Sequence, residues 1–432
     1  VKVGPFVVQV VVNATAENQS GNGFDQQITY TISGDGSIAV DQAVDGRGER
    51  FVVARMGVRM FPDAKLDRFT WLGRGPTENY SDRKRGSDIG LYSSTVKEQL
   101  TPYVRPMECG NHEDVRWAAL TGEDGAGLMA VALSGPFQAS ALPYRDEDLN
   151  KAEYAYQLPT GTGPVFCFSA KTLGVGSAAC GPRPLSQYMV YSDPIAFSYV
   201  LRPVPAGTQD LAELARQPAP ARVAPVEIRH DSAGKVTLSC PTPGASISYS
   251  IGDGEMQPYT EPFTLKDRKL TATASAPGLI PMSPRQMTIK FDRGKWKIVS
   301  VDSFQPDEGI PEHAIDNDPN TYWHTQWGPD SPPHPHELVI DFGEELKLSA
   351  VVYQGRQDMD HGRIGDYEIY LSNDKSNWGP PAARGRFQNN AEKQTVKLPS
   401  PVTARYLKIV ALNEVSGNNW TTIAELSIIP AK

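Results

Sequence analysis

The fold is decided by residues 71–117, which read WLGRGPTENYSDRKRGSDIGLYSSTVKEQLTPYVRPMECGNHEDVRW. Gly and Pro recur in this stretch too often for a long helix. The charged residues between them include Arg74, Glu78, Asp82, Arg83, Arg85, Glu108, Asp114 and Arg116. The aromatic residues that flank them are Trp71, Tyr80, Tyr92, Tyr103 and Trp117. This mixture predicts irregular loops that are held by Arg–carboxylate pairs and by aromatic packing.

On both sides of this stretch the sequence alternates as strands do. FVVQVVV, ITYTI and RFVVARMGVRM precede it, and GLMAVAL, VFCFSA and FSYVLRP follow it. SGDGS at 33–37 is a hairpin turn signal between two of these strands. No long helical period competes with the alternation. We therefore predict an all-β chain, with a sandwich whose two sheets bury alternate residues.

Several longer motifs occur in a specific order in this first part of the chain. WLGRGPTENYSDR is followed by TPYVRPMECGN, VRW, GLMAVA, SALPY and LGVGSAACGPRPLSQY. This series resembles the small-chain domain of β-galactosidases of glycoside hydrolase family 2. The resemblance covers residues 1–203 and implies a large β-sandwich that buttresses a catalytic (β/α)-barrel lying upstream in the same polypeptide.

The composition fits a soluble, globular protein with two to four domains in 432 residues. The net charge of -8 gives no support to nucleic-acid binding. No apolar run approaches the roughly 20 residues that a membrane-spanning helix needs. The chain starts inside a strand at VKVGPFVVQVVV, so we expect a fragment of a longer, secreted or periplasmic protein. Its cysteines are expected to be buried thiols, with a Cys109–Cys180 bridge as the alternative.

Three further segments follow the first domain. Residues 204–225 are rich in Ala and Pro and predict a linker with one short helix at DLAELARQ. Residues 226–292 have short strands and frequent turns, and PGASISYS, YTEPF and LTATASAPG resemble the immunoglobulin-like domain at the end of chitobiases. This small module contains no cluster of ionisable residues, so we interpret it as a spacer.

Residues 293–432 again alternate as strands and become rich in aromatic residues and histidine. HAIDNDPNTYWHT, PHPHELVIDFG, YQGRQ, GRIGDYEIYLSND and RYLKIVAL occur in this order. They resemble the discoidin or coagulation-factor type C domain that forms carbohydrate-binding module family 32. The resemblance implies a C-terminal jelly-roll sandwich. The complete chain is thus expected to hold three β-sandwich modules.

Glycoside hydrolysis needs two carboxyl groups about 5–5.5 Å apart in retaining enzymes. Glu78, Glu108 and Glu113 qualify by residue type alone. The resemblance places both catalytic glutamates on the upstream barrel, so we expect no catalytic residue in this chain and no hydrolysis by it alone. In some relatives a small-chain loop also lays a Trp against the substrate. The matching loop here carries Cys180 and no Trp, so that contact is not expected.

A run of hard oxygen ligands occurs in the C-terminal module, at 316–321. Such a cluster in a short turn suits Ca²⁺, and the alternative is an Asx turn without metal. The resemblance implies a structural calcium held by the side chains of Asp316, Asp318, Thr321 and Glu425. It adds the backbone carbonyls of His313 and Ala424 and would join the two ends of the jelly roll.

A sugar such as galactose is bound by an aromatic platform under its apolar face and by polar groups at its hydroxyls. Trp327 and Trp420 are the candidate platforms, and Glu308, His324 and Arg356 are the candidate hydroxyl ligands. These positions match the galactose-binding residues of family 32 modules. Asp360 and His361 stand where many members carry Asn, which leaves the exact sugar open. In the alternative interpretation Trp323 is core and this surface binds protein, lipid or nothing.

The sequence as a whole predicts the C-terminal accessory region of a β-galactosidase that hydrolyses terminal β-galactosides. Its partners are then galactose-containing glycans and the upstream barrel, without nucleic acid and without a membrane span. Tethering to glycans raises the effective concentration of substrate near the active site. The alternative is an adhesion-type module, binding glycan or protein, with no hydrolase upstream.

Overall fold

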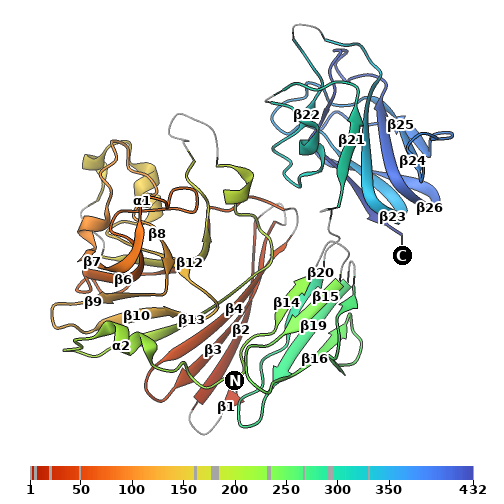
Figure 1. The fold of residues 1–432 in the computed structure, drawn as a ribbon. Helices are drawn as coiled ribbons and strands as arrows, with labels where there is room; N and C mark the ends of the chain where they lie inside the picture. The colour runs from red at the N-terminus through yellow and green to blue at the C-terminus, as the bar shows by residue number, and fades with distance from the viewer. Residues whose placement is uncertain are drawn as a thin grey trace. The chain divides into compact units, whose positions relative to one another are not determined.

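A computed structural model of the chain describes residues 2–3, 7–18, 22–47, 50–159, 163–176, 184–230, 235–265, 268–289, 293, 295–306, 308–328 and 331–431. The chain divides into two compact units (Figure 1). Unit one consists of Val1–Arg229, Thr237–Phe263 and Arg268–Ile289, and unit two of His230–Val236, Thr264–Asp267 and Lys290–Lys432. Antiparallel sheets dominate both units, which confirms the all-β prediction.

Unit one is built on a large sandwich formed by residues up to 204. Its first sheet has the spatial order β1 (Lys2–Val3), β2 (Val7–Glu17), β3 (Gly23–Ser33), β4 (Ile38–Arg47), β13 (Ile195–Val204), β10 (Gly127–Ala132), β9 (Trp117–Thr121), β6 (Arg68–Gly75) and β7 (Asp88–Thr95). The second sheet has the order β5 (Arg55–Met60), β12 (Val165–Thr172), β11 (Phe137–Leu142) and β8 (His112–Val115). All neighbouring strands for which a register is defined are antiparallel.

The core between these sheets is largely aromatic. Phe69 and Trp71 stack at 4.8 Å between ring centroids, and Phe168 meets Tyr199 edge-to-face at 4.8 Å. Phe166 and Phe197 belong to the same cluster, and all six rings are buried. Such side chains bury 150–250 Å² each, on the order of several kcal/mol apiece, so this cluster dominates the stability of the sandwich.

Residues 71–117 differ from the prediction in one respect, because they contain strands as well as loops. Gly73 lies inside β6, where a Cβ atom would stand 2.7 Å from Val115 Cγ2. This glycine therefore permits a close approach of two strands, and it does not mark a turn. The expected Arg–carboxylate pairs are confirmed: Arg74 Nε donates to Asp114 Oδ2 at 2.5 Å, and Arg83 Nη2 donates to Glu78 Oε1 at 2.5 Å.

The helical elements are short. They are α1 (Asp146–Lys151), α2 (Leu211–Arg216) and the 3₁₀ turns η1 (Lys97–Gln99), η2 (Ala155–Gln157), η3 (Ser186–Tyr188) and η4 (Pro311–Ile315). Helix α2 lies where DLAELARQ predicts a helix, and Asp210 caps its N-terminus by accepting a bond from Glu213 N. Further along, Arg222 forms a buried ion pair with Asp41 at 2.6 Å. The segment after β13 is thus attached to the sandwich at defined points.

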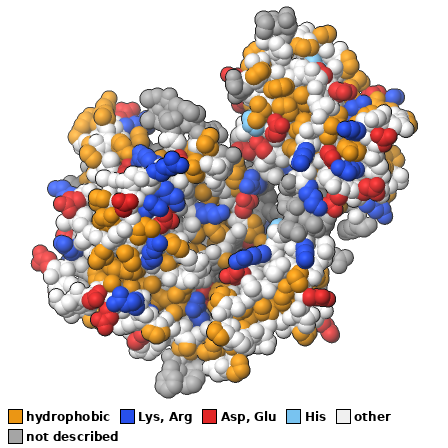
Figure 2. All heavy atoms as spheres, viewed as in Figure 1, with side chains coloured by type: hydrophobic (Ala, Val, Ile, Leu, Met, Phe, Trp, Pro, Cys, Tyr) orange, Lys and Arg blue, Asp and Glu red, His pale blue; other side chains and the backbone are white. Residues whose placement is uncertain are grey.

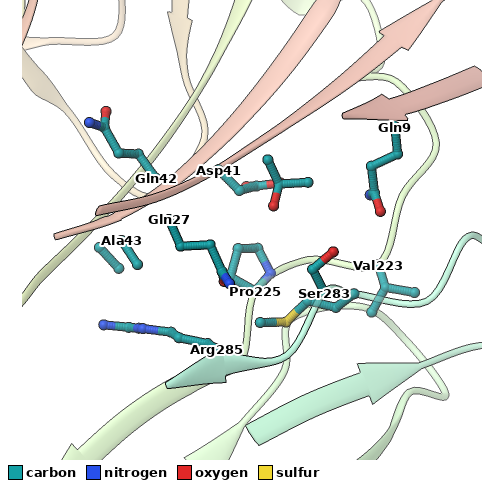
Figure 3. A pocket seen from close by; sticks show the side chains of 12 residues that line it. Gln9, Gln27, Asp41, Gln42, Ala43, Val223, Pro225, Ser283 and Arg285 are labelled. Atoms are coloured by element: carbon teal, nitrogen blue, oxygen red, sulfur yellow. The ribbon is translucent and has the colours of Figure 1, made fainter. Parts of the chain in front are cut away.

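The small module consists of two sheets. One has the order β14 (Glu227–His230), β15 (Lys235–Ser239) and β18 (Phe263–Thr264), and the other has the order β17 (Gln257–Pro258), β16 (Ser246–Ile251), β19 (Arg268–Ser275) and β20 (Arg285–Ile289). Gln27 Nε2 of the large sandwich donates to the Pro284 carbonyl at 3.0 Å. A cavity of about 30 Å³, roughly the volume of one water molecule, is lined by residues of the large sandwich and of the small module. Figure 3 shows Gln27, Ser283 and Arg285 around it. The sequence does not predict this contact.

The jelly roll of unit two is organised by two long strands. Its sheet has the order β21 (Lys297–Val301), β23 (His336–Gln354), β26 (Lys393–Ala411), β24 (Asp366–Ser372) and β25 (Ala383–Arg386), with β28 (Glu425–Pro430) also paired to β23. The register between β23 and β26 breaks from Asp341 to Leu346. Such a break bends both strands. A second register shift, between Leu348 and Ala350, reverses the alternation, so Leu338 before it and Val351 after it face the same core.

Two general properties of the molecule bear on function. Figure 2 shows acidic and basic side chains interspersed over the visible face. Among the described residues, no helix has the length and apolar character that crossing a membrane requires.

Candidate functional site

The candidate sugar residues gather around a short hairpin of unit two. β22 (Trp323–His324) pairs with β27 (Thr422–Ile423), with His324 opposite Thr422. Successive side chains of a strand point to opposite faces. Trp323 is fully buried and donates from Nε1 to the Ser303 carbonyl at 3.0 Å, so His324 points the other way. Gly309 packs against His324 so closely that a Cβ atom would lie 2.6 Å from His324 Cβ.

His324 is a neutral hydrogen-bond acceptor at this position. Its Nδ1 lies 2.6 Å from the Thr325 carbonyl, which only accepts, so Nδ1 carries the proton and Nε2 has the lone pair. Nε2 has no hydrogen-bond partner among the described residues. Burial, together with the charges of Arg356 and His361, lowers the pKa of His324 to about 4 against the opposing effect of the hydrogen bond to Thr325. The ring is therefore neutral near pH 7 and offers an acceptor to a hydroxyl group.

Two tryptophans flank this histidine. The ring of Trp327 lies 4.4 Å from that of His324 in an edge-to-face arrangement, and Trp327 is 37% exposed. The ring of Trp420 lies 6.3 Å from His324 and 5.9 Å from His361. Trp420 is half-buried. Both indoles stand beside the acceptor nitrogen, as platforms for a sugar ring require.

Arg356 is held rigidly next to this group. Its Nε and Nη2 donate to Asp358 at 2.6 and 2.9 Å, and its guanidinium lies 4.1 Å from the centre of the Tyr322 ring. The Arg356 carbonyl accepts two bonds from Arg363, at 3.1 and 2.8 Å. The pair with Asp358 uses one edge of the guanidinium fork and leaves Nη1 as a donor outside that pair.

Sequence reasoning did not single out Asp358 and Tyr322. The available signals were local: Asp358 follows Arg356 by two residues, and Tyr322 shares a strand face with His324 by alternation. Burial raises the pKa of Tyr322, with Arg356 opposing and the charges of Asp358 and Glu308 adding to the effect. Exposed Glu308 thus lies within electrostatic range of the group, although no hydrogen bond joins it to the other candidates in the described residues.

The remaining two candidates have different positions. Asp360 Oδ2 accepts from Asn389 Nδ2 at 3.4 Å, so its carboxylate is not the partner of Arg356. His361 is exposed, its ring faces Trp420, and its carbonyl accepts from Thr422 Oγ1 at 3.3 Å. The structure therefore brings together His324, Trp327, Arg356, His361 and Trp420, with Glu308 nearby and Asp360 at the margin.

The candidate calcium ligands also lie close together, in the loop after η4 and at the start of β28. Asp316 accepts from Asp318 N at 2.9 Å and from Thr321 Oγ1 at 2.7 Å, as an Asx turn does. Burial raises the pKa of Glu425 to about 7, while Arg293 opposes this effect and Asp316 adds to it. The two carboxylates, Asp316 and Glu425, are therefore neighbours in a poorly solvated place.

The fit of this loop to a hard cation has arguments on both sides. Glu425 Oε1 is buried without a hydrogen-bond partner, and the donors are oxygen atoms of the kind that Ca²⁺ prefers. On the other side, Arg293 Nη1 donates to Glu425 Oε2 at 2.8 Å and its Nη2 to Asn317 Oδ1. The two candidate carbonyl ligands belong to neighbouring elements. His313 lies in η4, Ala424 directly precedes β28, and η4 packs against β28. Among the described residues, no group of three or more His, Cys, Asp or Glu side chains forms a metal centre.

The acidic residues of the large sandwich occupy structural networks. Glu78 accepts from Thr101, Tyr103, Arg83 and the backbone nitrogen of Gly110. Glu108 pairs with Arg55 at 2.9 Å, and buried Glu113 accepts from Asn111 at 3.3 Å. Free thiols are found at Cys109, Cys167 and Cys240. Cys180 and the loop around it lie outside the described residues.

Comparison with known proteins places both ends of the chain. Residues 2–201 match the family model of the β-galactosidase small chain, and residues 298–426 match that of the F5/8 type C domain. A β-galactosidase of Priestia megaterium is 38% identical over 149 residues, covering 34% of this chain and 14% of that protein. A sialidase of Micromonospora viridifaciens is 35% identical over 141 residues, covering 32% and 22% respectively.

Solved structures add a similar module. The family 32 carbohydrate-binding module of C. perfringens NanJ, in complex with galactose, is 30% identical. It covers 32% of this chain and 94% of that chain, with a TM-score of 0.28. This chain spans less than two thirds of the length of either curated relative. On the two family matches, this protein joins a β-galactosidase small-chain domain to an F5/8 type C domain.

Proposed function

We propose that this chain is the C-terminal accessory region of a β-galactosidase acting on terminal β-galactosides, and that its jelly roll binds galactose-containing glycans. One observation carries the binding proposal. The neutral imidazole of His324 presents an acceptor nitrogen, its ring lies 4.4 Å from that of Trp327 and 6.3 Å from that of Trp420, and the charge of Arg356 acts on it. An apolar platform, an acceptor and a planar donor are the elements that recognise a sugar face and its hydroxyls.

Galactose suits this arrangement because its axial hydroxyl leaves one face of C–H groups free to stack on an indole. The hydroxyl groups at the edge of the ring then meet Nε2 of His324 as acceptor and Arg356 as donor. Exposed Glu308 supplies a second acceptor. The site is a loop surface in which Trp327 is only partly buried, so few contacts enclose the sugar. A Kd of about 0.1–1 mM is expected for such a surface.

Titration of the full chain with galactose, N-acetyllactosamine and glucose, followed by NMR shifts or calorimetry, tests the binding proposal. Galactose and N-acetyllactosamine should bind and glucose should bind more weakly, because its equatorial 4-hydroxyl presents a different edge to His324 and Arg356. An equal response to glucose, or no response to any of the three sugars, contradicts the galactose assignment.

We assign the hydrolytic activity to a catalytic barrel that lies upstream in the same polypeptide. We also propose that the protein is secreted or periplasmic. The network positions of Glu78, Glu108 and Glu113 support a non-catalytic role for these three acids. The chain alone should therefore not hydrolyse a chromogenic β-galactoside. Turnover by a preparation from a host that lacks its own β-galactosidase gene would overturn this assignment.

A structural calcium ion is the second part of the proposal. Asp316, Asp318, Thr321 and Glu425 would hold it, with the carbonyl oxygens of His313 and Ala424. The partnerless, buried Oε1 of Glu425 supports this set, because an unpaired buried carboxylate oxygen is costly unless a cation or donor meets it. The ion would supply charge compensation between η4 and β28, and Arg293 would then have to share or release Glu425.

A further inference from the structure

Two further histidines, His334 and His336, lie next to each other at the start of β23, with ring centroids 4.7 Å apart. His336 is buried, with no exposed side-chain surface. Its Nδ1 lies 2.6 Å from Asp302 Oδ2, and its Nε2 lies 2.7 Å from the carbonyl oxygen of Asn419. Asn419 immediately precedes Trp420, one of the two indole platforms. The imidazole therefore bridges a fixed carboxylate and the backbone of the platform loop.

Both partners of His336 can only accept hydrogen bonds. A neutral imidazole has one N–H and one lone pair, so it would turn its lone pair toward either the carboxylate or the carbonyl. The imidazolium donates to both. Asp302 is itself immobilised, because its Oδ1 accepts from Glu337 N at 2.7 Å. The two contacts of His336 are thus satisfied together only when the ring is protonated.

The charges around His336 favour this form. Burial by itself lowers the pKa of His336, but the hydrogen bonds to Asp302 and Asn419, with the charge of Asp302, outweigh burial and raise it. The other titratable groups facing the pair are His334, whose ring lies 4.7 Å away, and buried Glu414. Burial and the charge of His336 lower the pKa of His334. His334 therefore stays neutral while His336 is charged.

The other flank of Trp420 is held by bonds that do not need a charge. Thr421 Oγ1 lies 3.0 Å from His334 Nε2. Thr421 also exchanges two bonds with Thr325, from its own nitrogen at 2.9 Å and from Thr325 N at 3.0 Å. The residue before Trp420 depends on His336, whereas the residue after it is held without titration near neutral pH. Loss of the His336 proton would loosen one flank of the platform.

We propose that protonated His336, anchored by Asp302, is a positioning residue that holds Trp420 in the sugar site, so that galactose affinity falls as the pH rises. This inference rests on the proposed galactose binding. A group whose pKa is raised by folding contributes fully below its ordinary value, and the contribution is lost as the pH rises through the raised value. The loss therefore occurs on the alkaline side of about pH 6.5, the ordinary histidine value.

Galactose affinity of the full chain is measured from pH 5.5 to 9.5. It should fall by about three- to tenfold across the alkaline limb, the size of one neutral hydrogen bond, because deprotonated His336 can donate to only one of its two partners. His336→Gln should bind more weakly at pH 6 and show a flat profile. Asp302→Asn should move the midpoint to lower pH, because burial then acts on His336 without its counter-charge. A wild-type profile that is flat to pH 9.5 overturns the proposal.

Two matched variants separate this effect from others. Asp341→Asn makes the same charge change as Asp302→Asn, but in β23, the strand of His336, where the carboxylate pairs with Arg405 at 2.8 Å, and it should leave the midpoint unchanged. His361→Gln removes the other imidazole that faces Trp420, at 5.9 Å, and should retain the alkaline loss. A shift of the midpoint in Asp341→Asn, or a flat profile in His361→Gln, would contradict the role of His336.

A sugar-free measurement distinguishes failure of this inference from failure of galactose binding. With 5-fluorotryptophan incorporated, the ¹⁹F resonance of Trp420, assigned from Trp420→Phe, should move with pH in the wild type and stay fixed in His336→Gln. If that shift occurs but no sugar binds at any pH, the galactose assignment fails, while the role of His336 in positioning Trp420 is retained. If galactose binds while the resonance is independent of pH, the role of His336 in positioning Trp420 fails, and the galactose assignment is retained.

Discussion

Two buried histidines, His112 in the large sandwich and His324 in the jelly roll, show how similar burial serves different purposes. Burial lowers the pKa of each to about 4. Both ring nitrogens of His112 are occupied, at 3.1 Å from the Arg74 carbonyl and at 2.6 Å from Gln99 Oε1, and its ring packs 4.1 Å from Trp71. His324 uses one nitrogen and has partly exposed indoles beside it.

The difference lies in what remains unsatisfied. In residues 71–117 the Glu78 carboxylate and both ring nitrogens of His112 have partners within the fold, and Trp71 is 1% exposed. Around residues 322–327 several groups can still bind a ligand. They are the Arg356 guanidinium edge outside the pair with Asp358, the Nε2 of His324 and the exposed part of the Trp327 ring. A polar network whose groups all have hydrogen-bond partners rigidifies a fold. A rigid network in which some groups have no partner can bind a ligand through those groups. The first region should therefore respond to mutation in stability, and the second in binding.

The largest effect is expected in the large sandwich. Glu78→Ala removes a carboxylate that accepts from Arg83, Thr101, Tyr103 and Gly110. Leaving these donors without a partner should cost about 3 kcal/mol or more in the free energy of unfolding. Urea unfolding measures the loss. Glu123→Ala, in an exposed turn, is the matched control and should change little. A loss for Glu78→Ala as small as that of the control would break the comparison.

The next effect concerns the candidate calcium loop. A ligand that binds only the folded state stabilises it by RT ln(1 + [L]/Kd), about 2.7 kcal/mol when free calcium is about 100 times Kd. Chelator should therefore lower the melting temperature of the jelly roll, and Asp316→Ala should remove that sensitivity. Asp374→Ala, in another turn of the same module, should retain it. A melting curve that chelator leaves unchanged in the wild type would count against the ion.

Arg356→Ala should weaken galactose binding by about 1.5–3 kcal/mol, because the hydroxyl partners of a charged donor are left unpaired. The change should leave unfolding almost unaffected, since Arg356 is bound mainly to exposed Asp358. Asp360→Ala is the matched control, because its carboxylate contacts Asn389 instead. Calorimetric titration compares the two variants. Equal losses in both would mean that the Arg356 fork does not select the sugar.

The smallest expected effect is that of mild acid on galactose affinity, which should stay nearly constant. The pKa of His324 is lowered to about 4, so the ring keeps its acceptor nitrogen down to that pH and loses it only below. Galactose affinity should thus change by less than about twofold between pH 6.5 and 5.5, where an ordinary histidine would titrate. NMR titration at several pH values measures it. A steep loss within this interval would show that His324 is not the desolvated acceptor inferred from its burial.

Some features of this protein are readable from its sequence because they are local. Strand alternation at 28–30 predicts that Ile28 and Tyr30 face the core, since the side-chain period of a strand is two. The hard oxygen atoms of 316–321 and the indoles of 327 and 420 identify candidate ligands by residue type. The glycines of 71–117 were misleading, because a glycine that admits a neighbouring strand, as Gly73 does for Val115, has the same letter as one in a turn.

Other features were decided only by the tertiary structure, because they join residues far apart in the chain. Nothing local indicates that the Asn419 carbonyl meets His336, or that the ring of Trp420 lies near that of His324. The sequence determines which groups are available and which face of a strand they occupy. The pairing of strands such as β22 with β27 determines which groups come within hydrogen-bond distance, and hence which capacity remains for a ligand.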